Sequence, residues 1–457
     1  MSSSGRTTDL GAEVRRLALP AILHSLLQTL VFVVDRIMLG RHGSTALAAM
    51  QIAGSLEWSI WSVFAAFEVG TIARVGRHVG AGDRSGARRA TWLSLGIAVL
   101  AGAGLACFTP LVLALLPTIL GAGVSEGALA EARGYLGVTI ASSPIVFLAI
   151  TLTAALTAGG DTRTPLAIGI VANVFHIGLN RVLILGVDGI APAMGARGAG
   201  ISTAATFAIE TALALVALTR RARPVSLRAP PEHDPPPGST RGEARELVRV
   251  GAPAFVERVL YHVGFMTYSV LVARLGDASM AANQSLISVE SICFLSGDGF
   301  AVAAAALVAQ KLGAGRPEEA HRAAWIAAGY AAAFLTAFGV LALLFRDLIL
   351  PIFSDDPVVN ALGRSAMPIL AFVQPFMAVT LVLAQSLRGA GRTREALGVS
   401  VIGAVFVRIL ASWFFGMFAG LGLVGIWMGA TTDWIVRTTV LTTIFRRMES
   451  AQRSRRS

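Results

Sequence analysis

The sequence predicts an all-α integral membrane protein, and two observations support this prediction. Of the 457 residues, 54% are hydrophobic and only 14% are charged, whereas a soluble protein carries roughly a quarter charged residues. The apolar residues are grouped into blocks of about 18 to 25, which is the length that a helix needs to cross a hydrocarbon core. Inside a bilayer, a helix satisfies all its backbone polar groups internally, so we expect each block to be helical.

Twelve such blocks can be counted along the chain, each a predicted transmembrane helix. They cover residues 17–39, 50–73, 92–117, 132–157, 166–186, 198–219, 250–273, 281–308, 323–345, 361–385, 397–417 and 421–444. The Pro- and Arg-rich stretch between the sixth and seventh blocks is typical of an exposed linker. The predicted organisation is an N-tail (1–16), an N-terminal lobe (17–219), a linker (220–249), a C-terminal lobe (250–444) and a basic C-tail (445–457).

The basic residues indicate how the chain is oriented. Of the 38 Lys and Arg residues, 27 fall in the tails, the linker and the loops on one side of the predicted membrane. By the positive-inside rule, both termini and the linker are cytoplasmic, in a cell (inner) membrane. The net charge of +11 then favours anionic lipid as a partner and not nucleic acid. The two cysteines lie in apolar blocks without metal-ligand spacing, so we expect neither a metal nor another cofactor.

The two halves of the sequence repeat each other. A shift of 233 residues places "GRHGSTALAAMQ" (40–51) on "ARLGDASMAANQ" (273–284), and "GAGDRSGARRATW" (80–92) on "GAGRPEEAHRAAW" (313–325). In these segments, Gly82 and Gly315 are expected to form tight turns at helix ends. Six spans return the chain to the same side, so the repeat predicts two parallel six-helix bundles, related by a pseudo-twofold axis along the membrane normal, around a central cavity. This favours an alternating-access transporter over a membrane enzyme or a channel.

Several of these segments resemble a known family. "LGRHGSTALAAMQ", "VGRHVGAGDRSGARRA" and "LTAGGDTRTPL", with their second-half partners, are similar to the multidrug and toxic compound extrusion (MATE) family. "GAPAFVERVLYHVGF" resembles its bacterial DNA-damage-inducible F-type (DinF-like) branch. The resemblance implies a secondary antiporter, not an enzyme, that exports cationic or amphipathic drug-like compounds in exchange for H⁺ or Na⁺, and we expect a functional monomer. The alternative is a flippase for lipid-linked oligosaccharides or other lipids, from the same wider superfamily.

Two acids are candidates for proton coupling. Asp35, in "VFVVDRIMLG", matches the helix-one acid that the family uses for ion coupling. The alternative is that Asp35 and Arg36 lie near the outer end of the helix and reach the lipid headgroups. Glu257, in the seventh block, is the second candidate; its alternative is a structural interaction with an arginine such as Arg258.

The fifth block departs from the family pattern. Its layout is Asn173, His176 and Asn180, where the family commonly has Asn at the second position and Asp at the third. Asn180 cannot take up a proton or supply a charged cation ligand, so H⁺ coupling through Asp35 is favoured over Na⁺. His176 could titrate near neutral pH, or it could be hydrogen-bonded between helices.

The remaining predicted residues are polar or charged groups inside apolar blocks. Gln51, Gln284 and Gln374 are expected to line the substrate and ion cavity together with the three polar residues of the fifth block. Asp433 needs a partner in the membrane, for which Arg408 and Arg437 are the candidates.

Overall fold

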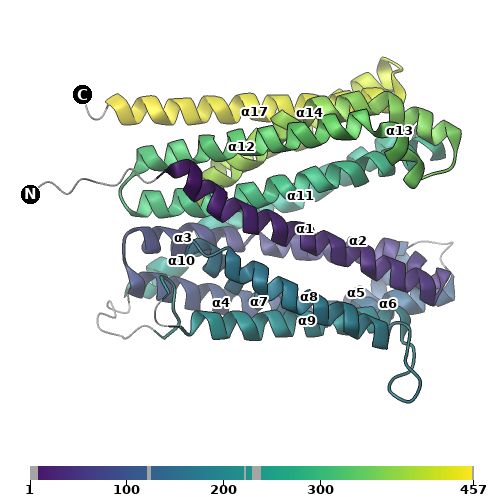
Figure 1. Ribbon diagram of the computed structural model, residues 1–457, viewed down its shortest axis with the longest axis horizontal. Helices are drawn as coiled ribbons and strands as arrows, with labels where there is room; N and C mark the ends of the chain where they lie inside the picture. Colours follow the sequence, from purple (N-terminus) through teal and green to yellow (C-terminus); the bar gives the residue numbers. More distant parts are fainter. Residues whose placement is uncertain (1–8, 121–124, 221–222, 229–237, 455–457) are drawn as a thin grey trace, which may run out of the picture. The chain divides into compact units, whose positions relative to one another are not determined.

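In the computed structural model, residues 9–120, 125–220, 223–228 and 238–454 are described, and their regular structure is helical apart from one isolated bridge between Val187 and Ala191. This confirms the all-α prediction (Figure 1). The helices are α1 (Leu10–His42), α2 (Ser44–Ala65), α3 (Glu68–Gly80), α4 (Arg84–Cys107), α5 (Thr109–Leu120), α6 (Glu126–Ala141), α7 (Ser143–Ala158), α8 (Arg163–Leu183), α9 (Gly195–Leu218), α10 (Gly238–Ala273), α11 (Asp277–Gly313), α12 (Pro317–Leu344), α13 (Arg346–Ile349), the short 3-10 helix η1 (Leu350–Ile352), α14 (Pro357–Gly389), α15 (Thr393–Ser400), the π-helix η2 (Val401–Val407), α16 (Arg408–Trp413), the π-helix η3 (Phe414–Phe418) and α17 (Gly422–Ser454).

The helices form two compact units. The N-unit comprises residues 23–251, and the C-unit comprises residues up to Ile22 together with those from Ala252 onward. In the N-unit, α9 packs against α6, α7 and α8; in the C-unit, α14 packs against α11, α12 and α17 (Figure 1). The units differ from the predicted lobes at one point in each half, because the first turns of α1 belong to the C-unit and those of α10 belong to the N-unit.

The internal repeat reappears in the helix boundaries. A shift of 233 residues places Ser44, the start of α2, on Asp277, the start of α11, and it places Gly80, the end of α3, on Gly313, the end of α11. The unbroken α11 is therefore the counterpart of the pair α2 and α3. The turns predicted after these helices are also confirmed: Gly82 and Gly315 have φ of +74° and +70°, a left-handed conformation that glycine adopts without strain.

Eight helices within the described residues are long and apolar enough to cross a membrane, and the bent pair α6 and α7 makes a ninth span. These nine coincide with nine of the twelve predicted blocks. The other three blocks lie in α2 with α3, in α10 and in α17. α10 and α17 are 36 and 33 residues long, but each carries an acid and an arginine within its predicted span, which lowers its apolar character.

The bend between α6 and α7 has a local cause. The two helices meet at 54° around Ser142. Pro144, at the start of α7, cannot donate a backbone hydrogen bond to the preceding turn. The Ser142 hydroxyl donates to the carbonyl oxygen of Thr139 at 2.9 Å, which is a local alternative to the helical ladder.

An acid in the first turns of α10 and an acid in the first turns of α1 are each bound by basic side chains of the same unit. In the N-unit, His78 Nε2 lies 3.3 Å from Glu243 on α10, and Arg74 donates to both oxygens of Glu243, at 2.8 and 2.6 Å. In the C-unit, Lys311, which the 233-residue shift places on His78, lies 2.9 Å from Glu13 on α1. These contacts attach the first turns of α10 to the N-unit and the first turns of α1 to the C-unit.

The predicted linker is shorter than the sequence suggested. α10 begins at Gly238, and Val225 and Leu227 are buried in the N-unit. The backbone N–H of Leu227 donates to the carbonyl oxygen of Leu218 at 2.8 Å. α17 likewise continues to Ser454, into the predicted C-tail, whereas most of the predicted N-tail (residues 1–8) lies outside the described residues.

Candidate ion-coupling site

Asp35 is buried in the N-unit and directed toward α8. Its Oδ1 lies 2.8 Å from His176 Nε2 and accepts a hydrogen bond from Asn180 Nδ2 at 2.6 Å. Asp35 is 8% exposed and His176 is 2% exposed. Asp35 therefore does not reach outward to headgroups, which was the alternative considered for it, whereas the neighbouring Arg36 is exposed. The spacing of His176 and Asn180, one helical turn apart, brings both side chains to one face of α8.

The contact of Nδ1, the other ring nitrogen of His176, determines which ring nitrogen carries a hydrogen. His176 Nδ1 lies 2.9 Å from Thr206 Oγ1, and the Thr206 hydroxyl is placed to donate to the carbonyl oxygen of Ser202 at 2.7 Å. With that donation made, Nδ1 must carry a hydrogen and donate it to Thr206. The contact between Nε2 and Asp35 then needs one further proton, since two lone pairs cannot face each other at 2.8 Å. In this arrangement Asp35 and His176 share one proton.

Removing the shared proton requires a rotation of the Thr206 hydroxyl and the loss of any hydrogen bond from Asn180 Nδ2 to His176 Nε2, two atoms that lie 2.9 Å apart. A neutral His176 with its hydrogen on Nε2 donates to the Asp35 carboxylate, and its bare Nδ1 then accepts from Thr206. The hydroxyl of Thr206 points to the carbonyl oxygen of Ser202 in one state and to His176 in the other. The cluster can therefore hold or release a proton while the hydrogen bonds of His176 to Asp35 and Thr206 are kept, as buried polar groups require.

Thr206 was missed by the sequence analysis. It belongs to a polar stripe on α9, Ser202, Thr206 and Glu210, in which each residue lies four positions after the last. In an otherwise apolar span, this spacing places all three on one face. The stripe was therefore visible in the sequence, although its contact with α8 was not.

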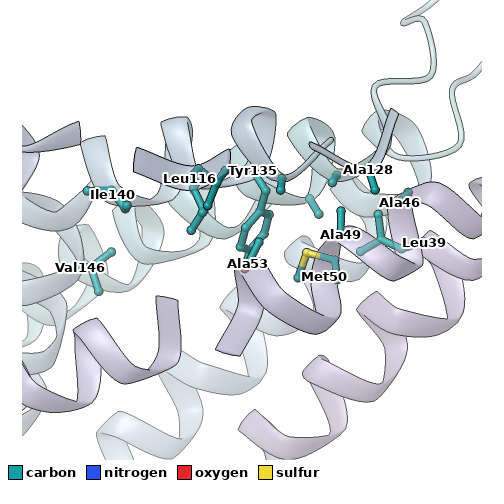
Figure 2. Close-up of a cluster of buried hydrophobic side chains, with 14 of the residues drawn as sticks. Leu39, Ala46, Ala49, Met50, Ala53, Leu116, Ala128, Tyr135, Ile140 and Val146 are labelled. Carbon is teal, nitrogen blue, oxygen red and sulfur yellow. The ribbon is translucent and has the colours of Figure 1, made fainter. Parts of the chain in front are cut away.

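A second buried acid of the N-unit lies on α2. Glu57 is 3% exposed, and its Oε2 accepts a hydrogen bond of 2.5 Å from the Tyr135 hydroxyl. Figure 2 shows the Tyr135 ring reaching from α6 toward the stretch of α2 around Ala53, within a cluster of apolar side chains. The apolar surroundings make a bare carboxylate costly at this position.

The acids of the C-unit have different partners. Glu257 is paired with Arg388, which donates from Nε at 3.1 Å and from Nη2, and with the hydroxyl of Ser400 at 2.5 Å. This geometry supports the structural interpretation of Glu257 over proton coupling, with Arg388 as the partner and not the adjacent Arg258. A carboxylate held by a guanidinium at this range keeps its charge and is a poor proton carrier.

Asp433 is bound by both predicted arginines. It is fully buried and accepts from Arg437 Nε at 2.7 Å, from Arg437 Nη2 at 2.6 Å and from Arg408 Nε at 2.9 Å. The Arg437 guanidinium also lies 3.9 Å from the centre of the Trp434 ring. The prediction that Arg408 and Arg437 are the partners of Asp433 is confirmed.

The buried acids inside the predicted spans thus have different partners in the two units. Five acids inside the predicted spans are buried in the described part of the chain. In the C-unit, Glu257 and Asp433 are each paired with arginine. In the N-unit, the described contacts of the three acids include no arginine or lysine, and His176 is the basic group beside them. The three acids are Asp35, Glu57 and Glu210.

The other predicted cavity residues are spread over both units. Asn173 is buried on α8, one turn before His176, and Gln374 is fully buried on α14, where its amide donates to the carbonyl oxygen of Leu370 at 2.8 Å. Gln284 is exposed on α11. Gln51 lies in α2, but its side chain is outside the described residues. The central cavity and its lining stay a prediction.

Comparison with known proteins decides the family. The profile of the MatE family matches residues 20–182 and 253–414, one segment in each half of the chain. The chain belongs to the MatE family. With its apolar helices, this makes it an all-α, multi-pass membrane transporter.

Named relatives match this MatE chain over most of their own length. A probable multidrug resistance protein, NorM, of Thermotoga maritima is 27% identical over 94% of this chain and 91% of its own length. The protein of the same name from Xanthomonas axonopodis is 29% identical over 97% and 94%. The multidrug resistance protein PmpM of Pseudomonas aeruginosa is 27% identical over 93% and 85%. The narrower resemblance to the DinF-like branch stays a prediction.

Solved structures share the fold. A MATE transporter in a straight conformation superposes with a TM-score of 0.87 at 20% identity, over 98% of this chain and 97% of that one. A transporter of the MOP superfamily from Pyrococcus furiosus, described as having a binding pocket of reversed polarity, gives 0.86 at 20% identity, over 97% and 96%. At this identity the likeness shows the fold alone.

Proposed function

We propose that this MatE protein is a secondary antiporter that exports cationic or amphipathic drug-like compounds in exchange for H⁺ by alternating access. It works as a monomer in the inner membrane, with both termini cytoplasmic, and needs neither a cofactor nor a catalytic site. The single observation that supports this most strongly is the buried Asp35, which is bonded to His176 and Asn180. The multidrug resistance names of full-length relatives support the substrate class.

The ligand set of Asp35 favours a proton over Na⁺. A histidine ring nitrogen stands at 2.8 Å from the carboxylate and an amide N–H at 2.6 Å, so the near neighbours of Asp35 are nitrogen groups. Hard cations such as Na⁺ prefer several oxygen ligands. A titratable imidazole beside a carboxylate is instead suited to holding and releasing a proton near neutral pH.

The acidic interior of the N-unit suits exchange between a proton and an organic cation. A buried carboxylate without an arginine is costly when it is bare. Either a proton or a positively charged substrate removes this cost, so the two compete for the same charge. Competition of this kind couples export of one to import of the other. In the C-unit, the arginines already neutralise the buried acids, and such competition has no basis there.

The test is transport in proteoliposomes. Ethidium, a flat hydrophobic cation, serves as the substrate, and its movement is measured under an imposed pH gradient or an imposed Na⁺ gradient. We expect the pH gradient alone to drive ethidium transport, and Asp35→Asn to abolish this. Transport driven by Na⁺ alone would contradict H⁺ coupling, and transport that depends on neither gradient would contradict antiport.

A further inference from the structure

Glu210 is a buried acid that the mechanism above does not use. It lies on α9, is 7% exposed and falls inside the predicted span 198–219. It follows Thr206 by one helical turn, about 6 Å along the helix axis. In the proposed orientation α9 runs toward the cytoplasm, so Glu210 lies on the cytoplasmic side of the site around Asp35.

The direction of the Glu210 side chain brings it toward His176. Side chains on a helix point back toward its N-terminus and cover the preceding turn. We therefore expect the carboxylate of Glu210 to lie over the turn of α9 that carries Thr206, whose hydroxyl is 2.9 Å from His176 Nδ1. Glu210 lies within electrostatic range of the His176 ring. Figure 1 shows α8 and α9 lying side by side, in agreement with these contacts.

The groups that face this region come from five helices. They are Asp35 on α1, Glu57 on α2, Tyr135 on α6, His176 on α8 and Glu210 on α9. Among the described contacts of these groups, none is with an arginine or a lysine. A proton in this region therefore moves among three carboxyl groups and one imidazole, with no fixed positive charge to repel it.

We propose that Glu210 is the inner proton acceptor of the transporter, taking the proton that Asp35 and His176 share and passing it toward the cytoplasm. The inference rests on the proposed H⁺ coupling. In the forward step, Asp35 gives its proton to His176 Nε2. His176 gives its Nδ1 hydrogen to Thr206, and the Thr206 hydroxyl, after turning from the carbonyl oxygen of Ser202 toward Glu210, gives its own hydrogen to the Glu210 carboxylate. Asp35 becomes a carboxylate, Glu210 becomes a neutral acid, and His176 and Thr206 each lose one proton and gain one.

The experiment separates proton release from substrate handling. In proteoliposomes, ethidium exchange across the membrane without a gradient needs no net proton movement, whereas transport driven by a pH gradient does. For Glu210→Gln, we expect gradient-driven transport to fall about a hundredfold more than exchange does, the lower range for loss of a positioned acid or base. Glu210→Asp keeps the acid and should restore part of the driven rate.

Two threonine variants serve as a matched pair. Thr206→Val removes the hydroxyl through which the proposed transfer runs, so it should lower gradient-driven transport as Glu210→Gln does. Thr211→Val removes a hydroxyl on the same helix that donates to the carbonyl oxygen of Ile145 at 3.2 Å, so it should leave both rates unchanged.

The outcomes are distinct. An unchanged gradient-driven rate in Glu210→Gln would overturn the role of Glu210 while leaving H⁺ antiport through Asp35 intact. An equal fall in exchange and in driven transport would overturn it too, because it would indicate a role in substrate binding or folding. If the wild-type protein shows no response to a pH gradient, the proposed function itself fails, whatever the variants do.

Discussion

The contact between Asp35 and His176 is the smallest feature on which the proposed H⁺ coupling rests. His176 is held between Asp35 and Thr206 at 2.8 and 2.9 Å, so a hydrogen that leaves one side of the ring changes which hydrogen bonds the other side can make.

Replacing the imidazole tests this coupling. His176→Asn keeps a side chain of polar character but removes the ring that bonds both Asp35 and Thr206. We expect pH-driven ethidium transport to fall by about a hundredfold, the lower range for loss of a positioned acid or base, and its dependence on pH to change. The measurement is the pH profile of transport in proteoliposomes. A variant whose profile overlays that of the wild type would show that His176 takes no part in proton handling.

Part of this site was predictable from residue types. Asp35 was singled out because charged groups are rare in apolar spans, and His176 and Asn180 because they occupy the fifth-block positions of the family pattern. Their direct contact was not predictable, because it depends on which faces of α1 and α8 meet. Thr206 was missed because a threonine in an apolar helix commonly bonds its own backbone, as Thr206 does with the carbonyl oxygen of Ser202.

At the scale of helices, the ends of α3 and α11 hold the first turns of α10 and α1. Arg74 and His78 both contact Glu243, and burial and ion pairing act on that acid in opposite directions. Burial alone would raise the pKa of Glu243, but the hydrogen bonds from Arg74 and His78 outweigh it and lower the pKa to about 2.

Removing the charge of Glu243 should loosen α10. Glu243→Gln breaks a bidentate bond to Arg74, and we expect a loss of about 1.5–3 kcal/mol in the free energy of unfolding. The control is Glu246→Gln, which removes an exposed ion pair with Arg249 and should cost less than about 1 kcal/mol. Thermal unfolding of both variants in detergent measures the difference. Equal losses of stability in the two variants would show that the Glu243–Arg74 pair stabilises the protein no more than an exposed ion pair does.

The same contact predicts how stability depends on acidity. Because the folded pKa of Glu243 is lowered, its contribution is fully present above the unfolded value of about 4.5 and is lost as pH falls toward about 2. Wild-type protein should therefore lose stability between these values more steeply than Glu243→Gln does. Parallel curves for the two proteins between pH 5 and pH 3 would contradict this.

The helices themselves were predicted well, since each apolar block coincides with a helix, a helix pair or, for 397–417, the continuous run of α15, η2, α16 and η3. The breaks between consecutive helices were not predicted. α11 continues where its counterpart divides into α2 and α3, although both follow the same apolar pattern. A hydropathy pattern reports where apolar residues lie, but a break depends on local bonds such as that of Ser142 with the carbonyl oxygen of Thr139.

At the scale of the whole molecule, the two repeated halves have diverged in charge. The C-unit pairs its buried acids with arginines, and its half-buried acids Glu290 and Asp298 also lie within electrostatic range of arginine side chains. Among the described contacts of the three buried acids inside the predicted spans of the N-unit, Asp35, Glu57 and Glu210, there is no such arginine. The repeat in the sequence predicted two similar units; the pairing that makes them chemically different became visible only in the packed structure.

This asymmetry predicts opposite phenotypes for two similar substitutions. Asp433→Asn leaves two buried arginines without their counter-ion and should lower stability by about 3–5 kcal/mol. Asp35→Asn leaves an amide that can still bond His176 and Asn180, so it should fold normally and lose transport. Thermal unfolding in detergent and transport in proteoliposomes distinguish the two. The account fails here if Asp433→Asn is as stable as the wild type or if Asp35→Asn cannot be folded.

The central claim is that a cationic substrate displaces the proton held by Asp35 and His176. The most direct measurement is proton release when ethidium binds to the purified protein in weakly buffered detergent solution near pH 6. The account predicts about one proton released per ethidium bound to the wild type, since one buried acid carries one exchangeable proton, and none released by Asp35→Asn. Binding without proton release in the wild type, or equal release in Asp35→Asn, would contradict it.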